Sequence, residues 1–168
     1  MGRLISFRQS HVIIFLSICF VSLGQSGLAQ TVIPPDREGL LKGAGMGQAL
    51  YAEGNGYPGP QHVLDLKDDL GLTHDQLMRT EALRKVIGSS AVVKGEEIVQ
   101  AEEELNKLFT LERVNEHQLR QKLEEIGKLR AELRFIHLQA HVRMKQILTA
   151  EQLKRYNESR GHESQRQD

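Results

Sequence analysis

This sequence is short of cysteine, contains no tryptophan and has no surplus of charge of either sign. Its single cysteine, Cys19, lies in an apolar N-terminal stretch, so disulfides within the chain are excluded. The 22 basic and 22 acidic side chains cancel, whereas a nucleic-acid binder needs a basic surplus to neutralise phosphates. We therefore expect no nucleic-acid partner and a fold held together by helix packing or by association.

The first 29 residues have the composition of a secretory signal peptide. A basic stretch without acids is followed by the apolar run 12–24, which is too short to span a bilayer comfortably. Small residues at its exit predict cleavage after Ala29, and the alternative is an uncleaved N-terminal anchor. Cleavage predicts a periplasmic protein without stable membrane insertion. The mature chain would lack Cys19 and would carry 20 basic and 22 acidic side chains, a net charge of −2.

Helix-start and helix-stop residues divide the rest of the chain. Residues 30–60 are rich in glycine and proline, and we expect a flexible segment there. Residues 61–160 are expected to form an all-α domain, and residues 161–168 a disordered tail. The predicted helices are a short one at about 62–70, two long ones at about 74–108 and 116–147, and a last one of about ten residues after 149.

Apolar residues on the two long segments recur at alternating spacings of three and four, as in a coiled-coil seam. A short connection forces the two helices to run antiparallel, so the expected fold is a long helical hairpin with a short helix at each end. A lone hairpin buries only one seam, which favours a homodimer. The predicted seam residues are Leu77, Ile87, Ala91, Ile98, Ala101, Leu105, Leu108, Leu119, Leu123, Ile126, Leu133, Ala140, Met144 and Ile147.

Two hexapeptides, 72–77 and 148–153, share the pattern L-T-x-[DE]-Q-L, and each stands at a predicted helix start. The threonine is a good N-cap, and the glutamine three residues later can close a capping box. The motif residues are Leu72, Thr73, Gln76, Leu148, Thr149 and Gln152.

Two L-T-x-x-Q motifs at the starts of the second and fourth helices of a secreted all-α chain resemble the Spy/CpxP periplasmic family. That group also includes zinc-resistance-associated and heavy-metal sensor proteins. The resemblance covers about Tyr57 to Arg160. It implies an ATP-independent envelope-stress protein whose partners are unfolded periplasmic proteins or an envelope sensor protein. Some members are dimeric chaperones, and others bind Zn²⁺, Ni²⁺, Co²⁺ or Cu²⁺.

Cationic residues of the two long helices are the feature that fits a chaperone. They could form a basic concave face that attracts unfolded clients, with leucines between them for weak apolar contacts. The alternative is an ordinary solvated helix surface. The residues concerned are Arg79, Arg84, Lys85, Lys94, Arg120, Lys122, Lys128, Arg130 and Arg134.

A histidine pair is the feature that fits a metal-binding protein. His137 and His141 lie one helical turn apart, and two imidazoles at this spacing can chelate one divalent ion. Met144 follows on the same face and His62 begins the first short helix, a layout that resembles the family's sensors. Those sensors have a second first-helix histidine where this chain has Leu66, and the alternative is that His137 and Met144 are core residues. Asp65, Asp69 or Glu81 could complete the ligand shell.

Sequence motifs for catalysis are missing: there is no G-x-S-x-G, no H-E-x-x-H and no Walker loop. The glycine-rich stretch 43–47 does not follow a strand, so it is not a nucleotide loop. We therefore do not expect an enzyme. The first expectation is a Spy/CpxP-like protein that binds unfolded clients as a dimer, and the alternative is a periplasmic metal-binding or metal-sensing protein using His62, His137, His141 and Met144.

Overall fold

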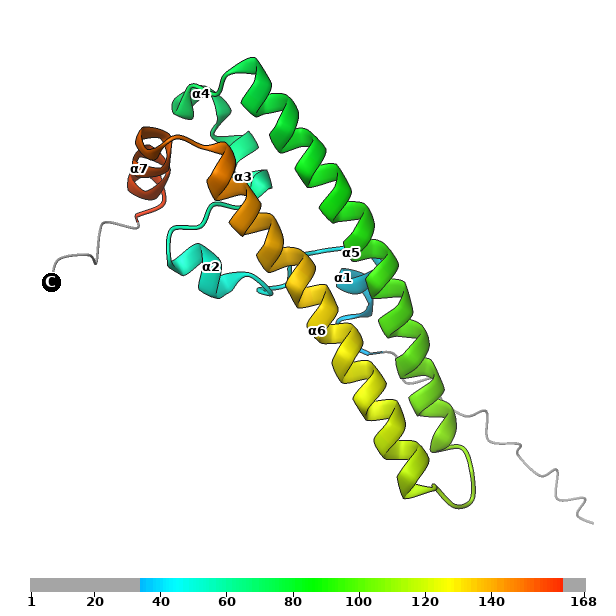
Figure 1. Ribbon diagram of the computed structural model, residues 1–168. Coiled ribbons are helices and arrows are strands. Elements are labelled where there is room, and N and C mark those ends of the chain that lie inside the picture. Colours follow the sequence, from blue (N-terminus) through cyan, green and yellow to red (C-terminus); the bar gives the residue numbers. More distant parts are fainter. Residues whose placement is uncertain (1–33, 162–168) are drawn as a thin grey trace, which may run out of the picture. The chain divides into compact units, whose positions relative to one another are not determined.

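The two long helices span the residues that the sequence predicts for them (Figure 1). In the computed structural model, which describes residues 34–161, helix α5 spans His74–Leu108 and helix α6 spans Glu116–Ile147. The hydroxyl of Thr73 caps α5, and the side-chain oxygen of Asn115 accepts from His117 N and Gln118 N to cap α6. The expected signal peptide with its cleavage after Ala29 and the expected tail from residue 162 onward lie outside the described residues.

The helices before and after the hairpin are short. The predicted helix at 62–70 is two pieces, α3 (Pro60–Asp65) and α4 (Lys67–Leu70), with a break at Leu66. Pro60 occupies the first helical position of α3, where its missing N–H costs nothing. Gly71 has φ 61 and ends α4 in the left-handed conformation that glycine adopts most easily. After α6, Thr149 caps α7 (Ala150–Ser159), as expected.

The glycine-rich segment differs from the expectation of a flexible connection. It contains helix α1 (Arg37–Leu41) and helix α2 (Leu50–Gly54), and the side chain of Leu40 has no exposed surface. The glycines hid this order from the sequence, because they weaken local helix propensity while burial of Leu40 stabilises α1 from outside. For residues 34–60, the prediction of flexibility is corrected accordingly.

Helices α5 and α6 lie side by side along their length and are joined by the turn at 109–115 (Figure 1). All regular elements of residues 34–161 are helices, which confirms the all-α class and the hairpin. One apolar cluster contains Leu40, Ala91, Ile98, Val99 and Leu133, and a second contains Val63, Leu70, Met144, Leu148 and Tyr156.

The predicted seam residues are buried or partly buried, with the exception of Leu123 toward the hairpin turn. Leu123 keeps 50 % of its surface exposed, although its spacing placed it in the seam. No helix among the described residues combines the length and the apolar character needed to cross a membrane.

Candidate functional site

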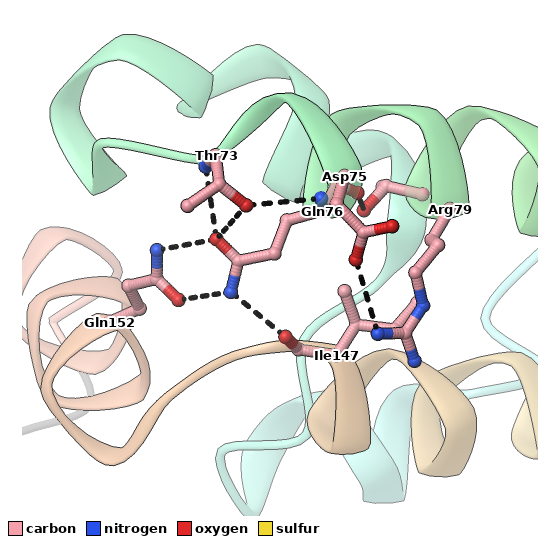
Figure 2. Close-up of polar contacts among 7 residues, drawn as sticks. Thr73, Asp75, Gln76, Arg79, Ile147 and Gln152 are labelled. Atoms are coloured by element: carbon pink, nitrogen blue, oxygen red, sulfur yellow. Dashed lines mark hydrogen bonds and ion pairs between the residues drawn. The ribbon is translucent and has the colours of Figure 1, made fainter.

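The two L-T-x-x-Q motifs meet through their glutamines (Figure 2). Gln76 Nε2 donates to Gln152 Oε1 at 2.8 Å, and Gln152 Nε2 donates back to Gln76 Oε1 at 3.0 Å. Each amide oxygen also accepts from the backbone N–H of its own capping threonine, at 3.0 Å for Thr73 and 2.9 Å for Thr149. Both side chains are buried, so these bonds are shielded from competing water.

Each glutamine also reaches across to the other motif. Gln76 Nε2 donates to the carbonyl of Ile147, the residue before the second motif, at 2.9 Å. Gln152 Nε2 donates to the carbonyl of Gly71, the residue before the first motif, at 3.3 Å. The repeat therefore forms a nearly symmetric junction that fastens α4–α5 to α6–α7. We call Thr73, Gln76, Thr149 and Gln152 the motif junction, and its polar groups are used up within the fold.

A second polar group lies where α2, α3 and α6 meet. One carboxylate oxygen of Glu53, Oε1, lies 3.9 Å from His62 Nδ1 and 3.8 Å from His141 Nε2. With His137, one turn before His141 on α6, these residues are called the histidine cluster below. Two of the histidines that the sequence suggested as ligands, His62 and His141, are thus brought to the same carboxylate.

Hydrogen bonding fixes the tautomer of His141. Its Nδ1 lies 2.9 Å from the backbone oxygen of Tyr57, which can only accept a hydrogen bond, so Nδ1 carries the hydrogen. In the neutral ring, Nε2 then has a free lone pair, and Nε2 lies 3.8 Å from the Glu53 carboxylate. Two acceptors at 3.8 Å repel each other unless a proton or a cation lies between them. His62 Nδ1 is also buried and has no hydrogen-bond partner.

Glycine at position 59 lets the two rings approach. A Cβ there would lie 3.0 Å from His141 Cε1, a tight contact, and 3.5 Å from His62 Nδ1, an ordinary one, so a side chain would crowd the His141 imidazole. The backbone from Tyr57 to Gly59 thus supplies the acceptor that orients His141 and leaves space beside both rings.

His137 lies beside this group and is also incompletely bonded. Its Nε2 is buried without a hydrogen-bond partner. Burial, and to a smaller extent the neighbouring His141, lowers the pKa of His137 below its ordinary value. Met144, by contrast, has no exposed surface and packs in the second apolar cluster with Val63 and Tyr156.

The carboxylates suggested for the rest of the shell remain at the surface. Asp65 accepts a hydrogen bond from Gln61 at 2.7 Å, and Asp69 and Glu81 are exposed. Over residues 34–161, no group of three or more His, Cys, Asp or Glu side chains is placed so that it could hold a metal ion. The histidine cluster therefore holds ligand atoms near one another without closing them around an ion.

Sequence reasoning missed Glu53 because it lies in the segment expected to be flexible. One signal could have found it: Glu53 is the only acidic residue between Glu38 and Asp65. An isolated carboxylate nine residues before a histidine is a reasonable ligand candidate once the segment between them is known to turn back.

Acidic partners neutralise much of the expected basic face. Lys122 lies 2.6 Å from both Glu104 and Glu125, and the hydrogen bond that it donates to Glu104 is the main reason that its pKa is raised. Arg130 lies 2.7 Å from both Asp36 and Glu102.

Two further cations of the expected face also have acidic neighbours. Lys94 contacts Glu97 and lies 2.8 Å from Glu132, and Arg79 lies 3.5 Å from Asp75. Paired cations attract an acidic client less strongly than free ones do.

No protein-family model, curated protein or solved structure matches this chain. Membership of the Spy/CpxP family therefore stays a prediction. Function is inferred below from the motif junction, the histidine cluster and the hairpin surface.

Proposed function

We propose that this chain is a periplasmic protein that binds a divalent transition-metal ion between Glu53, His62 and His141. The supporting observation is the carboxylate oxygen that lies 3.8–3.9 Å from one nitrogen of each ring, which in His141 is the nitrogen with the free lone pair. A cation placed there would turn a repulsive contact into two coordinate bonds.

The chemistry of the three groups favours Zn²⁺, Ni²⁺, Co²⁺ or Cu²⁺, because borderline metals prefer imidazole nitrogen with one carboxylate. At metal–ligand distances of about 2.0–2.2 Å, ligand atoms on one tetrahedral ion lie about 3.3 Å apart. The distances of 3.9 and 3.8 Å from Glu53 Oε1 to His62 Nδ1 and His141 Nε2 exceed that value, so the side chains would have to move closer together to bind an ion.

The bond from His141 Nδ1 to the Tyr57 carbonyl also fits this role. A metal-ligating histidine commonly donates its second ring N–H to a backbone carbonyl, which fixes the ring and makes the ligating nitrogen more basic. His137, one turn away with its own unpartnered Nε2, would supply a further ligand or leave that position to water.

Calorimetry of the mature chain after treatment with EDTA tests this proposal. One site should appear with Zn²⁺, Ni²⁺, Co²⁺ or Cu²⁺. Glu53→Gln, His62→Ala and His141→Ala should each weaken it about 100-fold or more, since even partners outside the ligand shell change affinity by about 10–100-fold. The matched control is His117→Ala, an exposed histidine on the same helix as His141. Absence of binding heat with all four metals, at a protein concentration above 100 μM, would refute the site.

A second function, binding of unfolded clients by a dimer, is favoured by a different observation. Met78, Val86 and Val93 on α5 are 52 %, 55 % and 54 % exposed, and their spacing places them on one helix face. An apolar face of this kind suits weak contacts to unfolded chains or to a second copy.

Two measurements test the second function. Suppression of client aggregation should persist in EDTA and should decrease in a Met78→Ser, Val86→Ser, Val93→Ser variant. Sedimentation equilibrium of the unchanged protein and of this variant reports whether this face forms the homodimer interface. A variant that protects clients as well as the unchanged protein would exclude the face.

A further inference from the structure

Helix α1 rests on α5 at a glycine. A Cβ on Gly95 would lie 2.1 Å from the carbonyl oxygen and 2.6 Å from the carbonyl carbon of Leu40, distances that no side chain can tolerate. The backbone of α1 therefore touches the backbone of α5 at this point. The Leu40 side chain is fully buried beside Ala91, Ile98 and Leu133. Gly95 thus makes a notch in the hairpin surface that fits a leucine on a short helical turn.

Charges beside the notch hold the start of α1. Asp36, four residues before Leu40, accepts a hydrogen bond from Arg130 Nη1 at 2.7 Å. Arg130 Nη2 donates to Glu102 at 2.7 Å, which orients the guanidinium toward α1. The hairpin therefore offers two features at a fixed separation, a leucine notch and a cation for an acidic side chain.

The five-residue helix α1 is too short to be stable by itself, and Asp36 makes no side-chain capping bond to it. The chain that follows includes Gly43, Met46 and Gly47 with φ of 61°, 42° and 73°. The order of α1 therefore depends on the surface against which it packs.

We propose that the surface formed by Ala91, Gly95, Ile98, Arg130 and Leu133 is a peptide-docking site and that α1 is its resident occupant. Its ligands are short segments that form one helical turn and carry an acidic residue four positions before a leucine. The site lies on other residues than the histidine cluster, and it does not depend on metal binding.

A labelled peptide with the sequence of residues 34–44 tests the proposal by fluorescence anisotropy. The full mature chain carrying Leu40→Asp, which frees the surface, should bind it saturably and at least about tenfold more tightly than the unchanged chain, whose own α1 competes. Replacing the peptide's aspartate with asparagine, or its first leucine with alanine, should weaken binding.

Two glycine variants in the Leu40→Asp chain provide a matched pair. Gly95→Ala fills the notch and should abolish binding. Gly88→Ala lies on the same helix, where a Cβ would meet nothing within 4 Å, and should leave binding unchanged. Both changes favour helix formation, so a difference between them reports the notch alone.

If Leu40→Asp impairs folding, hydrogen exchange in the unchanged protein replaces it. An excess of the peptide should then speed amide exchange in residues 37–42 by displacing α1, and the leucine-to-alanine peptide should not. Equal affinity in the two glycine variants, or no effect of the peptide on exchange, would overturn the proposal. The proposal would also be overturned if the unchanged protein forms dimers and Gly95→Ala abolishes them. The occupant of the site would then be α1 of a second copy.

Discussion

The motif junction and the histidine cluster are both buried polar groups, but only the first has its hydrogen bonds complete. In the junction, the amides of Gln76 and Gln152 each give and receive within the fold. In the cluster, His62 Nδ1 and His137 Nε2 have no partner, and His141 Nε2, with its free lone pair, lies 3.8 Å from a carboxylate. A buried polar group without a partner costs free energy, so we expect these nitrogens to meet a water molecule, an ion or another ligand.

This difference distinguishes residues whose polar bonds are complete within the fold from the residues that we propose to bind a metal ion. The junction stabilises the fold and has no capacity left for a ligand. The histidine cluster keeps buried ring nitrogens without hydrogen-bond partners at His62 and His137. If this difference holds, damage to the motif junction should lower stability and leave metal binding intact, and damage to the histidine cluster should do the reverse.

The largest expected effect is on stability, from Gln76→Ala. The change removes both bonds to the Gln152 amide and takes the side-chain partner from the Ile147 carbonyl and the Thr73 N–H, and we expect a loss of about 3 kcal/mol in the free energy of unfolding. Gln152→Ala should cost a similar amount, and the double variant less than the sum, because both changes break the same bonds. Urea denaturation in EDTA measures all three.

Gln100→Ala is the control for that series. Its amide is exposed and makes a long 3.4 Å bond to Glu104, so its effect should stay within about 0.5 kcal/mol. Additive costs at Gln76 and Gln152 would show that the two motifs act as separate helix caps.

The next effect is the gain in stability on adding metal. At a free metal concentration 100 times Kd, the unchanged protein should gain about 2.7 kcal/mol. Gln76→Ala, although destabilised, should show the same gain, whereas His141→Ala should show almost none. The gain is measured as the shift of the urea midpoint with and without metal. Loss of the gain in Gln76→Ala alone would mean that the junction positions the ligands.

These regions also differ in how far the sequence could predict them. Thr73 and Thr149 act on the next three residues, so the starts of α5 and α7 could be placed from local pattern alone. The reciprocal bond between Gln76 and Gln152 joins residues far apart in the chain, so the sequence showed each only as part of a capping box.

The histidine cluster was predicted in part. His62 and His141 followed from residue type and the antiparallel hairpin, but Glu53 lies in α2, whose order comes from tertiary contacts rather than from helix propensity. The same reason explains why burial of Leu40 was not foreseen. The prediction that Leu123 lies in the seam was wrong because a heptad pattern marks a helix face. It does not show how far the partner helix and its covering segments extend.

A smaller effect is expected at the capping threonines. Thr73→Ala and Thr149→Ala should each lower the free energy of unfolding by about 1 kcal/mol, because the N3 amide loses its acceptor. Threonine to serine keeps the hydroxyl and should restore most of the loss. Helix content by circular dichroism and urea midpoints report both changes. A loss in the alanine variant as large as that of Gln76→Ala would show that the threonine, rather than the amide pair, holds the junction together.

The smallest expected effect is the pH dependence contributed by His137. Its folded-state pKa is lowered from the ordinary value of 6.5, chiefly by burial, so the unfolded chain binds more protons as the pH falls below 6.5. The free energy of unfolding should therefore fall as the pH drops from about 6.5 through the folded-state pKa and then level off, and His137→Gln should remove this decrease. Urea titrations across that range in EDTA measure it, with His117→Gln as the exposed control. A pH slope that survives His137→Gln would place the titrating group elsewhere. A slope that metal abolishes in the unchanged protein would tie the unpartnered ring nitrogen to the binding site, because a ligated imidazole no longer takes up a proton.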